Sequence, residues 1–245
     1  MIAAAAALAQ GGPVIPNFGR GDDCVRNNGK FCLNWFLDNF GNRFWPRVVE
    51  HVEMTLIAVS IGFVIAFAAA LLVHRWARGE VWFANLASVF YTIPSIAFFQ
   101  IMVPITGIGW LTIEIALISY TLLILFRNTL TGLREVPTEA KEAAEGMGLT
   151  RRQSLLQIEL PLAAPAIVAG IRVATVTTIS LATVAAFITP LGLGAPIFSA
   201  IQTGANTEFV AASLLAIALA LIADAAIVLV QRALTPWSRA RSTAT

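Results

Sequence analysis

The sequence predicts an all-α integral membrane protein, a bundle of about five transmembrane helices. Hydrophobic residues make up 58% of its 245 residues and charged residues only 12%, which excludes an ordinary soluble domain. Five apolar runs each have about the length that crosses a hydrocarbon core roughly 30 Å thick. Because these runs lack sustained period-two alternation, each is expected to be a helix and not a strand of a barrel.

The N-terminal segment 1–47 precedes the first run and is expected to be extracytoplasmic. Its Ala-rich start is too short to span a membrane and has no basic residue before it. Further along the same segment a helix is expected, which would either lie flat on the outer membrane surface or form a cap packed on the other helices. A cysteine and three aromatic residues at three- and four-residue spacing predict one apolar face of this helix: Cys32, Trp35, Phe36 and Phe40.

The only two cysteines, Cys24 and Cys32, both fall in this outer segment. Extracytoplasmic compartments are oxidising, so a local disulfide is chemically permitted. Two free thiols are the alternative.

The transmembrane domain is expected to cover residues 48–235, followed by a cytoplasmic tail at 236–245. Pro94 and Pro104 are expected to loosen the second span, because proline removes a helical hydrogen bond. The five predicted spans are, in order, 52–73, 82–104, 109–126, 162–187 and 208–231.

The distribution of lysine and arginine orients the bundle. The loops at 74–81 and 127–161 and the tail from 231 hold ten of the sixteen basic residues, whereas the stretches 105–110 and 188–207 hold none and the N-terminal segment holds five. Because basic residues concentrate in cytoplasmic loops, we expect the N-terminus outside and the C-terminus inside. The long loop between the third and fourth spans is then cytoplasmic.

This cytoplasmic loop, 127–161, is predicted to contain two short helices joined by a tight turn. Thr138 is the expected N-cap of the first helix, and Gly148 can adopt the left-handed conformation that ends it. Thr150 and Gln153 have the spacing of a capping box that begins the second helix. Such a unit would either receive a partner protein or fold back on its own bundle as a hinged loop.

One motif in this loop resembles that of a known family. The run Glu142-Ala143-Ala144 is followed by Gly148 and, ten residues further, by Ile158-x-Leu160-Pro161. This pattern is similar, position for position, to the motif of the permease subunits of binding-protein-dependent ABC importers.

The resemblance extends from about residue 50 to 235. It is closest to the osmoprotectant subfamily, which carries glycine betaine, choline, carnitine or proline betaine. Thr189, Pro190 and Leu191 depart from the Gly-Ala-Gly-Gly-Leu-Gly that relatives often have there. The segments that carry the resemblance are Tyr91-Thr-Ile-Pro-Ser-Ile, Ile105-Thr-Gly-Ile-Gly109, Arg127-Asn-Thr-Leu-Thr-Gly-Leu133, residues 142–172 and Ala186-Phe-Ile-Thr-Pro-Leu-Gly-Leu-Gly194.

The resemblance implies a division of labour among subunits in a bacterial-type cytoplasmic membrane. Two permease subunits, identical or homologous, would form the pathway. Two cytoplasmic ATPase subunits would bind ATP and Mg²⁺, and each would receive one coupling helix, roughly 138–148, with Glu142 facing the ATPase. An extracytoplasmic solute-binding protein would deliver the solute. No cofactor is therefore expected in this chain.

The residues themselves agree with a chain that is not an enzyme. The phosphate-binding pattern G-x-x-x-x-G-K-[ST] does not occur. With two histidines and no H-E-x-x-H motif, no catalytic or metal site is expected. A net charge of +2 is too small to indicate binding to nucleic acid.

Charged residues inside the spans are few, and each is costly at membrane depth. Arg172 is expected about 15 Å from the cytoplasmic start of the fourth span, and Asp224 about 12 Å from the same side in the fifth. The two are therefore predicted to pair; gating, solute contact and snorkelling are the alternatives. Glu114, near the outer end of the third span, is expected to be an interfacial or loop-capping acid.

The solute route is expected to use aromatic faces, because a quaternary ammonium group has no N–H to donate. Residues 188–204 are expected to form an external gate or re-entrant segment, with an ordinary outer loop as the alternative, since chain breaks at membrane depth must line a cavity or be covered. The candidates for pathway or gate are Tyr91, Pro94, Trp110, Pro190, Gly192 and Gly194.

Three functions remain open on the sequence. The first is an ABC importer permease for a compatible solute of the quaternary ammonium type. The second keeps this machinery for another small polar solute, such as an amino acid. The third is an autonomous channel or ion-coupled carrier, in which the cytoplasmic loop is only a connector.

Overall fold

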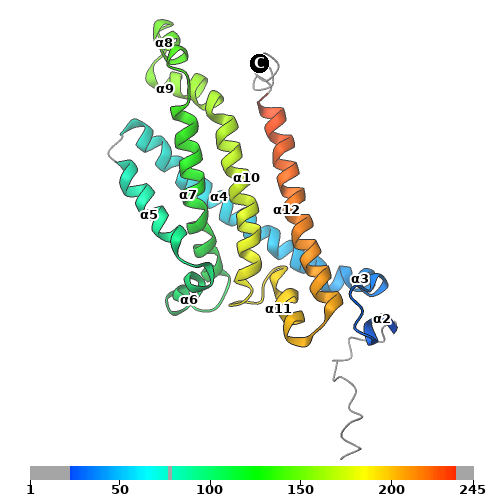
Figure 1. The fold of residues 1–245 in the computed structure, drawn as a ribbon. Coiled ribbons are helices and arrows are strands. Elements are labelled where there is room, and N and C mark those ends of the chain that lie inside the picture. Colours follow the sequence, from blue (N-terminus) through cyan, green and yellow to red (C-terminus); the bar gives the residue numbers. More distant parts are fainter. Residues whose placement is uncertain (1–22, 77–78, 236–245) are drawn as a thin grey trace, which may run out of the picture.

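The computed structural model describes residues 23–76 and 79–235, and the regular structure of these residues is helical (Figure 1). Two of the elements, η2 and η4, are single π-helical turns. We call the end of the molecule that carries α8 and α9 the cytoplasmic end, following the predicted orientation, and the opposite end, with α3, α6 and α11, the outer end. In chain order the elements are α2 (Asp23–Arg26), α3 (Leu33–Asn39), η2 (Phe40–Phe44), α4 (Trp45–Arg75), α5 (Glu80–Thr92), α6 (Ser95–Thr106), α7 (Trp110–Arg134), α8 (Thr138–Gly146), α9 (Arg151–Ser154), η4 (Leu155–Glu159), α10 (Leu160–Ala185), α11 (Gly194–Thr203) and α12 (Asn206–Leu234).

Helix α7 lies at the centre of the bundle, with α4 and α10 packed against it. Small residues let these three helices approach closely, as is usual in membrane bundles. A Cβ atom on Gly62 of α4 would lie 1.9 Å from the Thr121 hydroxyl of α7, and one on Gly170 of α10 would lie 2.6 Å from Cβ of Asn128. The glycines of α4 and α10 therefore let side chains of α7 pack directly against their backbones.

Within the described residues, four continuous helices are long and apolar enough to cross a membrane: 33–75, 110–134, 151–185 and 206–233. They contain the predicted first and fifth spans and nearly all of the third and fourth. The number becomes five if α5 and α6 together count as one broken span. The all-α membrane fold is thus confirmed.

The predicted second span, 82–104, is not one helix. Helices α5 and α6 meet at an angle of 100° (Figure 1). Proline disfavours helical geometry in the residue before it, and Ile93 is accordingly extended at φ −68° and ψ 129° before Pro94. The Tyr120 hydroxyl donates a hydrogen bond to the Ile93 carbonyl at 2.5 Å, which satisfies an acceptor that the break leaves free. Pro94 therefore breaks the span, whereas Pro104 lies inside α6.

The cytoplasmic loop differs from the prediction in two details. Thr138 is the first residue of α8, not its cap, because Pro137 takes the N-cap position. The capping box of Thr150 and Gln153 is formed, but the helix that it begins is not short. It continues through η4 into α10 as one helical run of 35 residues, Arg151–Ala185.

The N-terminal helix packs on the bundle, as the cap alternative predicted. Trp35 and Phe44 are buried together with Ala211 and Ala212 of α12. Helix α3 also runs on through η2 into α4, which makes one helical run of 43 residues, Leu33–Arg75. At 1.5 Å per residue this run is about 64 Å long, roughly twice the hydrocarbon thickness.

Candidate functional site

Helix α8 extends from the cytoplasmic end of the bundle and contacts only the short elements α9 and η4 among its main neighbours (Figure 1). Ala144 faces inward and is fully buried, whereas Glu142 and Ala143 are exposed. Met147, just past the helix, is 68% exposed. We call Glu142, Ala143 and Met147 the coupling face. It offers an anionic group beside small and apolar side chains for a partner surface.

The turn after α8 depends on Gly148. Its φ is +77°, a left-handed conformation that residues with a Cβ atom rarely adopt. The backbone N–H of Leu149 donates to the Ala144 carbonyl at 3.1 Å, and that of Gly148 donates to Glu145 at 2.9 Å. These bonds satisfy carbonyl groups at the end of the helix and fix the direction in which the chain leaves it.

Glu159 connects this cytoplasmic unit to the bundle. Its carboxylate lies 2.8 Å from Nε2 of His74, near the end of α4, and 3.9 Å from Nζ of Lys141 in α8. The Ser154 hydroxyl donates to it at 3.5 Å. We call Lys141, Glu159 and His74 the cytoplasmic junction. The sequence did not predict this junction. Its only signal was that an acidic residue, Glu159, occupies the unspecified position between Ile158 and Leu160 of the motif.

The remaining motif residues begin α10. Leu160 packs beside the buried residues Leu133 and Val136. Pro161 has no N–H to donate to the preceding turn, and the π-helical turn η4 lies directly before it. Ile158 is half-buried in this turn. The motif thus combines one exposed face on α8 with an anchored helix start.

The structure brings Arg172 of α10 and Asp224 of α12 together. Nε of Arg172 donates to Oδ1 of Asp224, and Nη2 donates to Oδ2, both at 2.9 Å. This is a two-bond arrangement that fits a planar guanidinium to a carboxylate. Both side chains remain about one-third exposed, at 34% and 35%.

The predicted pathway residues fall into separate groups. Tyr91 and Pro94 are exposed at the break between α5 and α6. The Tyr91 ring contacts that of Tyr120 edge-on, with centroids 6.2 Å apart. Trp110 packs beside the buried cluster that includes Phe98 and Tyr120.

Of the other group, Pro190 and Gly192 lie in the segment that joins α10 to α11, and Gly194 is the first residue of α11. Helix α4 holds this segment. Nη1 of Arg47 donates to the Pro190 carbonyl at 3.0 Å and to Oε2 of Glu50 at 2.8 Å. The same Glu50 oxygen accepts from the Gly192 N–H at 2.9 Å. We call residues 190–193 the outer segment.

His51 makes a second connection from α4 to the outer segment. Its Nδ1 accepts from the Leu193 N–H at 3.2 Å, and its Nε2 lies 3.0 Å from the Ile179 carbonyl of α10. Because the Leu193 amide can only donate, Nδ1 carries no proton, and Nε2 donates to Ile179. His51 is fully buried. The sequence did not predict a site role for Arg47, Glu50 or His51.

The N-terminal cap is closed by a disulfide between Cys24 and Cys32, with an S–S distance of 1.99 Å. The loop inside it contacts the start of α12. Nδ2 of Asn28 donates to the Gly204 carbonyl at 2.8 Å, and Oδ1 of Asn28 accepts from the Asn206 N–H at 3.1 Å. The cap is therefore bonded directly to the α11–α12 turn.

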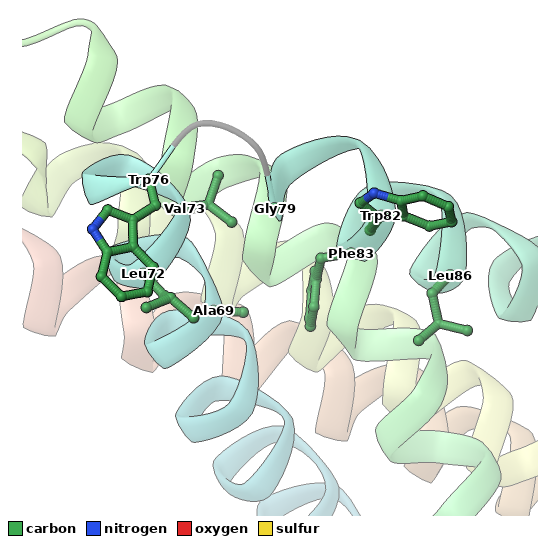
Figure 2. A pocket seen from close by; sticks show the side chains of 8 residues that line it. All are labelled: Ala69, Leu72, Val73, Trp76, Gly79, Trp82, Phe83 and Leu86. Carbon is green, nitrogen blue, oxygen red and sulfur yellow. The ribbon is translucent and has the colours of Figure 1, made fainter.

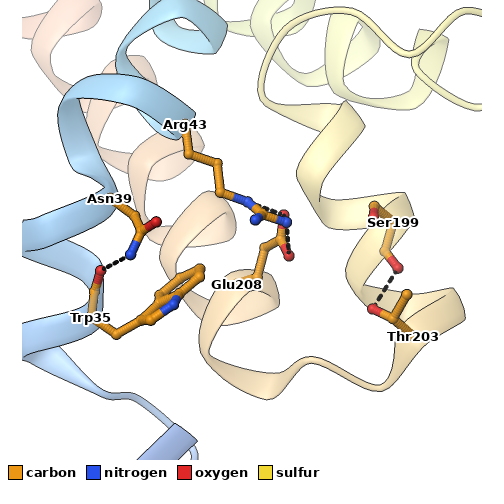
Figure 3. Close-up of polar contacts among 6 residues, drawn as sticks. All are labelled: Trp35, Asn39, Arg43, Ser199, Thr203 and Glu208. Carbon is orange, nitrogen blue, oxygen red and sulfur yellow. Dashed lines mark hydrogen bonds and ion pairs between the residues drawn. The ribbon is translucent and has the colours of Figure 1, made fainter. Parts of the chain in front are cut away.

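An ion pair adds to this attachment. Arg43 of η2 faces Glu208 of α12, and the two form a two-bond pair with Nη2–Oε2 at 2.8 Å (Figure 3). Glu208 is almost fully buried, at 3% side-chain exposure. A pocket of 440 Å³ lies beside this pair and is also lined by Arg47, Glu50 and Pro190.

A second, larger hollow of 1020 Å³ lies near the cytoplasmic end, between α4 and α5 (Figure 2). Its lining is almost wholly apolar, so it does not offer the groups that a polar solute needs. Trp76 and Trp82 lie at its rim and are largely exposed, as is typical of tryptophan at a membrane interface. The full lining is Ala69, Leu72, Val73, Trp76, Gly79, Trp82, Phe83 and Leu86.

Glu114 is buried in the bundle and does not cap a loop. It is 5% exposed in α7, and within the described part of the chain neither carboxyl oxygen has a hydrogen-bond partner. Among the described residues no three of the His, Cys, Asp and Glu side chains are grouped so that they could hold a metal ion.

Comparison with known proteins adds three findings. Residues 58–239 match the family "Binding-protein-dependent transport system inner membrane component". The choline transport system permease protein OpuBB of Bacillus subtilis is 33% identical over 82% of this chain and 93% of its own length. The osmoprotectant import permease protein OsmW of Salmonella typhimurium is 34% identical over 83% of this chain and 97% of its own.

The fold also matches a solved structure, an inward-facing conformation of the MetNI methionine ABC transporter. The TM-score is 0.70 at 23% identity, over 83% of this chain and 98% of the other. At this identity the match concerns the fold alone. The matched family region begins after the disulfide-closed cap.

Proposed function

The chain belongs to the family of inner membrane components of binding-protein-dependent transport systems, and we propose that within it the chain serves an ATP-driven importer of quaternary ammonium solutes. It is a multi-pass inner-membrane permease subunit, and the relatives found are transport subunits, not enzymes. Their names support the proposed cargo. They include choline, and a further Bacillus subtilis permease that is 31% identical is named for glycine betaine, carnitine and choline.

The observation that carries the coupling proposal is the exposure of Glu142 and Ala143 on α8, a helix that extends beyond the bundle. We propose that an ATPase subunit, which binds ATP and Mg²⁺, receives this coupling face in a cleft. A basic group in that cleft would pair with Glu142, and the small side chain of Ala143 would permit close contact. Movement of α8 would then reach the bundle through the cytoplasmic junction.

At the outer end, we propose that a solute-binding protein delivers the solute to a pathway formed by two permease subunits, with the outer segment as part of the gate. ATP binding would close the ATPase dimer, draw the two coupling helices together and turn the pathway from inward-facing to outward-facing. Pro190, Gly192 and Gly194 would permit the gate to bend, while Tyr91, Pro94 and Trp110 would belong to the pathway side of α5–α7.

The test is solute uptake by the assembled transporter in proteoliposomes, with ATP inside and binding protein outside. Radiolabelled choline is expected to enter only when ATP is present and to be competed by glycine betaine but not by unrelated amino acids. Uptake without ATP or without the ATPase subunits would contradict the proposal. If only amino acids compete, ATP-driven import would stand, but quaternary ammonium solutes would be refuted as the cargo.

Glu142→Lys tests the coupling face. It is expected to lower uptake about tenfold or more, because it would oppose a cationic group at the ATPase surface. Glu135→Lys is the matched control, since Glu135 is also exposed at the cytoplasmic end but lies before α8. Equal uptake by the two variants would refute the assignment of Glu142.

A further inference from the structure

We propose that Glu50 and His51 are positioning residues for the outer gate, with different tasks. Glu50, together with Arg47, forms a releasable latch on residues 190–192, and His51 forms a fixed anchor for Leu193. This inference rests on the proposed role of the outer segment as a gate. It goes beyond that role by naming the groups on α4 that keep the gate closed. Both residues precede the matched family region, which begins at residue 58.

The latch is built from bonds that water can replace. The side chains of Arg47 and Glu50 are 35% and 30% exposed, and both border the 440 Å³ outer pocket. Exposed ion pairs of this kind contribute little net stability, because water solvates the separated charges well. Release of the Pro190 carbonyl would therefore return an exposed acceptor and two partly exposed charged side chains to water, whereas the N–H of the buried Gly192 would reach water only as the segment lifts. The latch can hold the segment and still open.

The anchor has the opposite character. Both ring nitrogens of His51 are bonded, to Leu193 and to Ile179, and the ring is fully buried. To separate these groups would leave a buried donor and a buried acceptor unsatisfied, which is expensive in a low-dielectric interior. Leu193 itself is also fully buried. Residue 193 is thus held to both α4 and α10 by a buried ring, while residues 190 and 192 are bonded to α4 through the partly exposed side chains of Arg47 and Glu50.

Gly192 lies at the boundary between the two parts. Its φ is +59°, and a Cβ atom there would lie 2.8 Å from His51 Nδ1 and 2.8 Å from Cε of Met54. No larger residue fits this close approach to the anchor. The boundary between the movable and fixed parts of the outer segment is therefore set by one glycine and by the histidine that it touches.

The experiment measures how often the segment lifts. Leu191, which packs partly buried beside the central cluster, is replaced by cysteine in the complete transporter, and a membrane-impermeant maleimide is added from outside. The native cysteines are bonded to each other and do not react. Labelling rates are compared without nucleotide and with ATP and vanadate, in four backgrounds: unmodified, Glu50→Ala, Glu50→Gln and Glu53→Ala. Glu53 is the matched control, an exposed carboxylate three residues further along α4.

In the unmodified background labelling is expected to be slow without nucleotide and fast with ATP and vanadate. Glu50→Ala is expected to raise the nucleotide-free rate about tenfold, as the loss of a charge-assisted hydrogen bond implies, and to leave the ATP-vanadate rate unchanged. A general loss of packing would raise both rates. Glu50→Gln keeps an acceptor for Gly192 and is expected to restore most of the slow labelling, while Glu53→Ala is expected to behave as unmodified.

The outcomes separate this inference from the proposed function. If labelling of Leu191→Cys in the unmodified background does not respond to ATP, the outer segment is not a gate and the proposed function fails at that point. If labelling responds to ATP but Glu50→Ala matches Glu53→Ala, the gate stands and the latch is refuted. His51→Ala is expected to abolish the difference between the two conditions; a difference of normal size in that variant would refute the anchor.

Discussion

At the scale of single residues, the pairing of Arg172 with Asp224 shows how a membrane protein places two costly side chains. Each lies on a different helix, and the fold gives each the other as a partner through two hydrogen bonds. Neither would be tolerated alone at this depth without a water-filled surrounding. The pair therefore fixes the relative register of α10 and α12 near their cytoplasmic halves.

Exchange of the two charges tests this register. Arg172→Asp and Asp224→Arg are each expected to lower uptake strongly, because each places two like charges side by side. The double exchange restores an opposite-charge pair and is expected to recover most of the uptake and of the protein level in the membrane. This comparison isolates the pairwise interaction. A double variant as defective as the single variants would show that the pair does not set the register.

The sequence predicted residues whose role is local and missed those whose role depends on a distant partner. Gly148 could be assigned from its spacing after Glu142, because a helix end needs a left-handed residue there. Glu159, His51 and Glu50 could not, because the partners that define their roles, His74, Leu193 and Gly192, lie 85, 142 and 142 positions away. The loop-capping role expected of Glu114 is wrong, since its position in the third span says nothing about which groups surround it.

At the scale of elements, α8 is short and weakly attached, so its direction depends on how it ends. Both Gly146 and Gly148 have open space where a Cβ atom would lie, but only Gly148 has a positive φ. The two glycines therefore differ in backbone conformation and not in packing. This difference permits a clean comparison between them.

Gly148→Ala is expected to strain the turn by roughly 1–2 kcal/mol, the cost of a left-handed residue with a Cβ atom. Uptake should fall because the coupling face would point in another direction. Gly146→Ala should be neutral or slightly favourable, because alanine stabilises a helix that glycine weakens. Uptake and ATPase co-purification are measured for both. Normal uptake by Gly148→Ala would show that the turn geometry is not required.

Apolar runs predicted which segments are helical, but not where helices join or break. The sequence predicts two elements, the fourth span and a short helix before it, because Pro161 stands between them. In the structure the π-helical turn η4 precedes the proline, and the helix continues through it. Pro94 has the opposite outcome, because the Tyr120 hydroxyl can satisfy the freed carbonyl. The local signal is the same, and tertiary contacts decide between a continued helix and a break.

At the scale of the whole molecule, the N-terminal cap connects helices at the outer end, in addition to the contacts of α4 with the outer segment. The disulfide closes a loop whose two cysteines are eight residues apart and whose backbone and side chains bond to the start of α12. The aromatic spacing predicted the apolar face of this helix but could not say whether lipid or protein covers it. The small residues Ala211 and Ala212 of α12 provide the answer, because they leave room for Trp35 and Phe44.

Removal of the disulfide is expected to loosen the cap and leave the bundle intact. For a loop of this length, loss of the cross-link should cost the cap about 2.5 kcal/mol in the chain-entropy model. Hydrogen exchange of residues 24–44 in Cys24→Ser/Cys32→Ser should rise, while exchange of α7 should stay as in the unmodified protein. Unchanged exchange in the cap would show that Arg43–Glu208 and the Asn28 contacts hold it alone.

One helix, α4, touches both ends of the molecule, with His74 at the cytoplasmic junction and Glu50 at the outer segment. These residues are 24 positions apart, or about 36 Å along the axis. A rigid lever of that length amplifies rotation: a tilt of about 5° at His74 would carry Glu50 about 3 Å sideways, as far as a hydrogen bond is long. A small torque applied at the cytoplasmic end would thus suffice to separate Glu50 from its hydrogen-bond partner at the outer end.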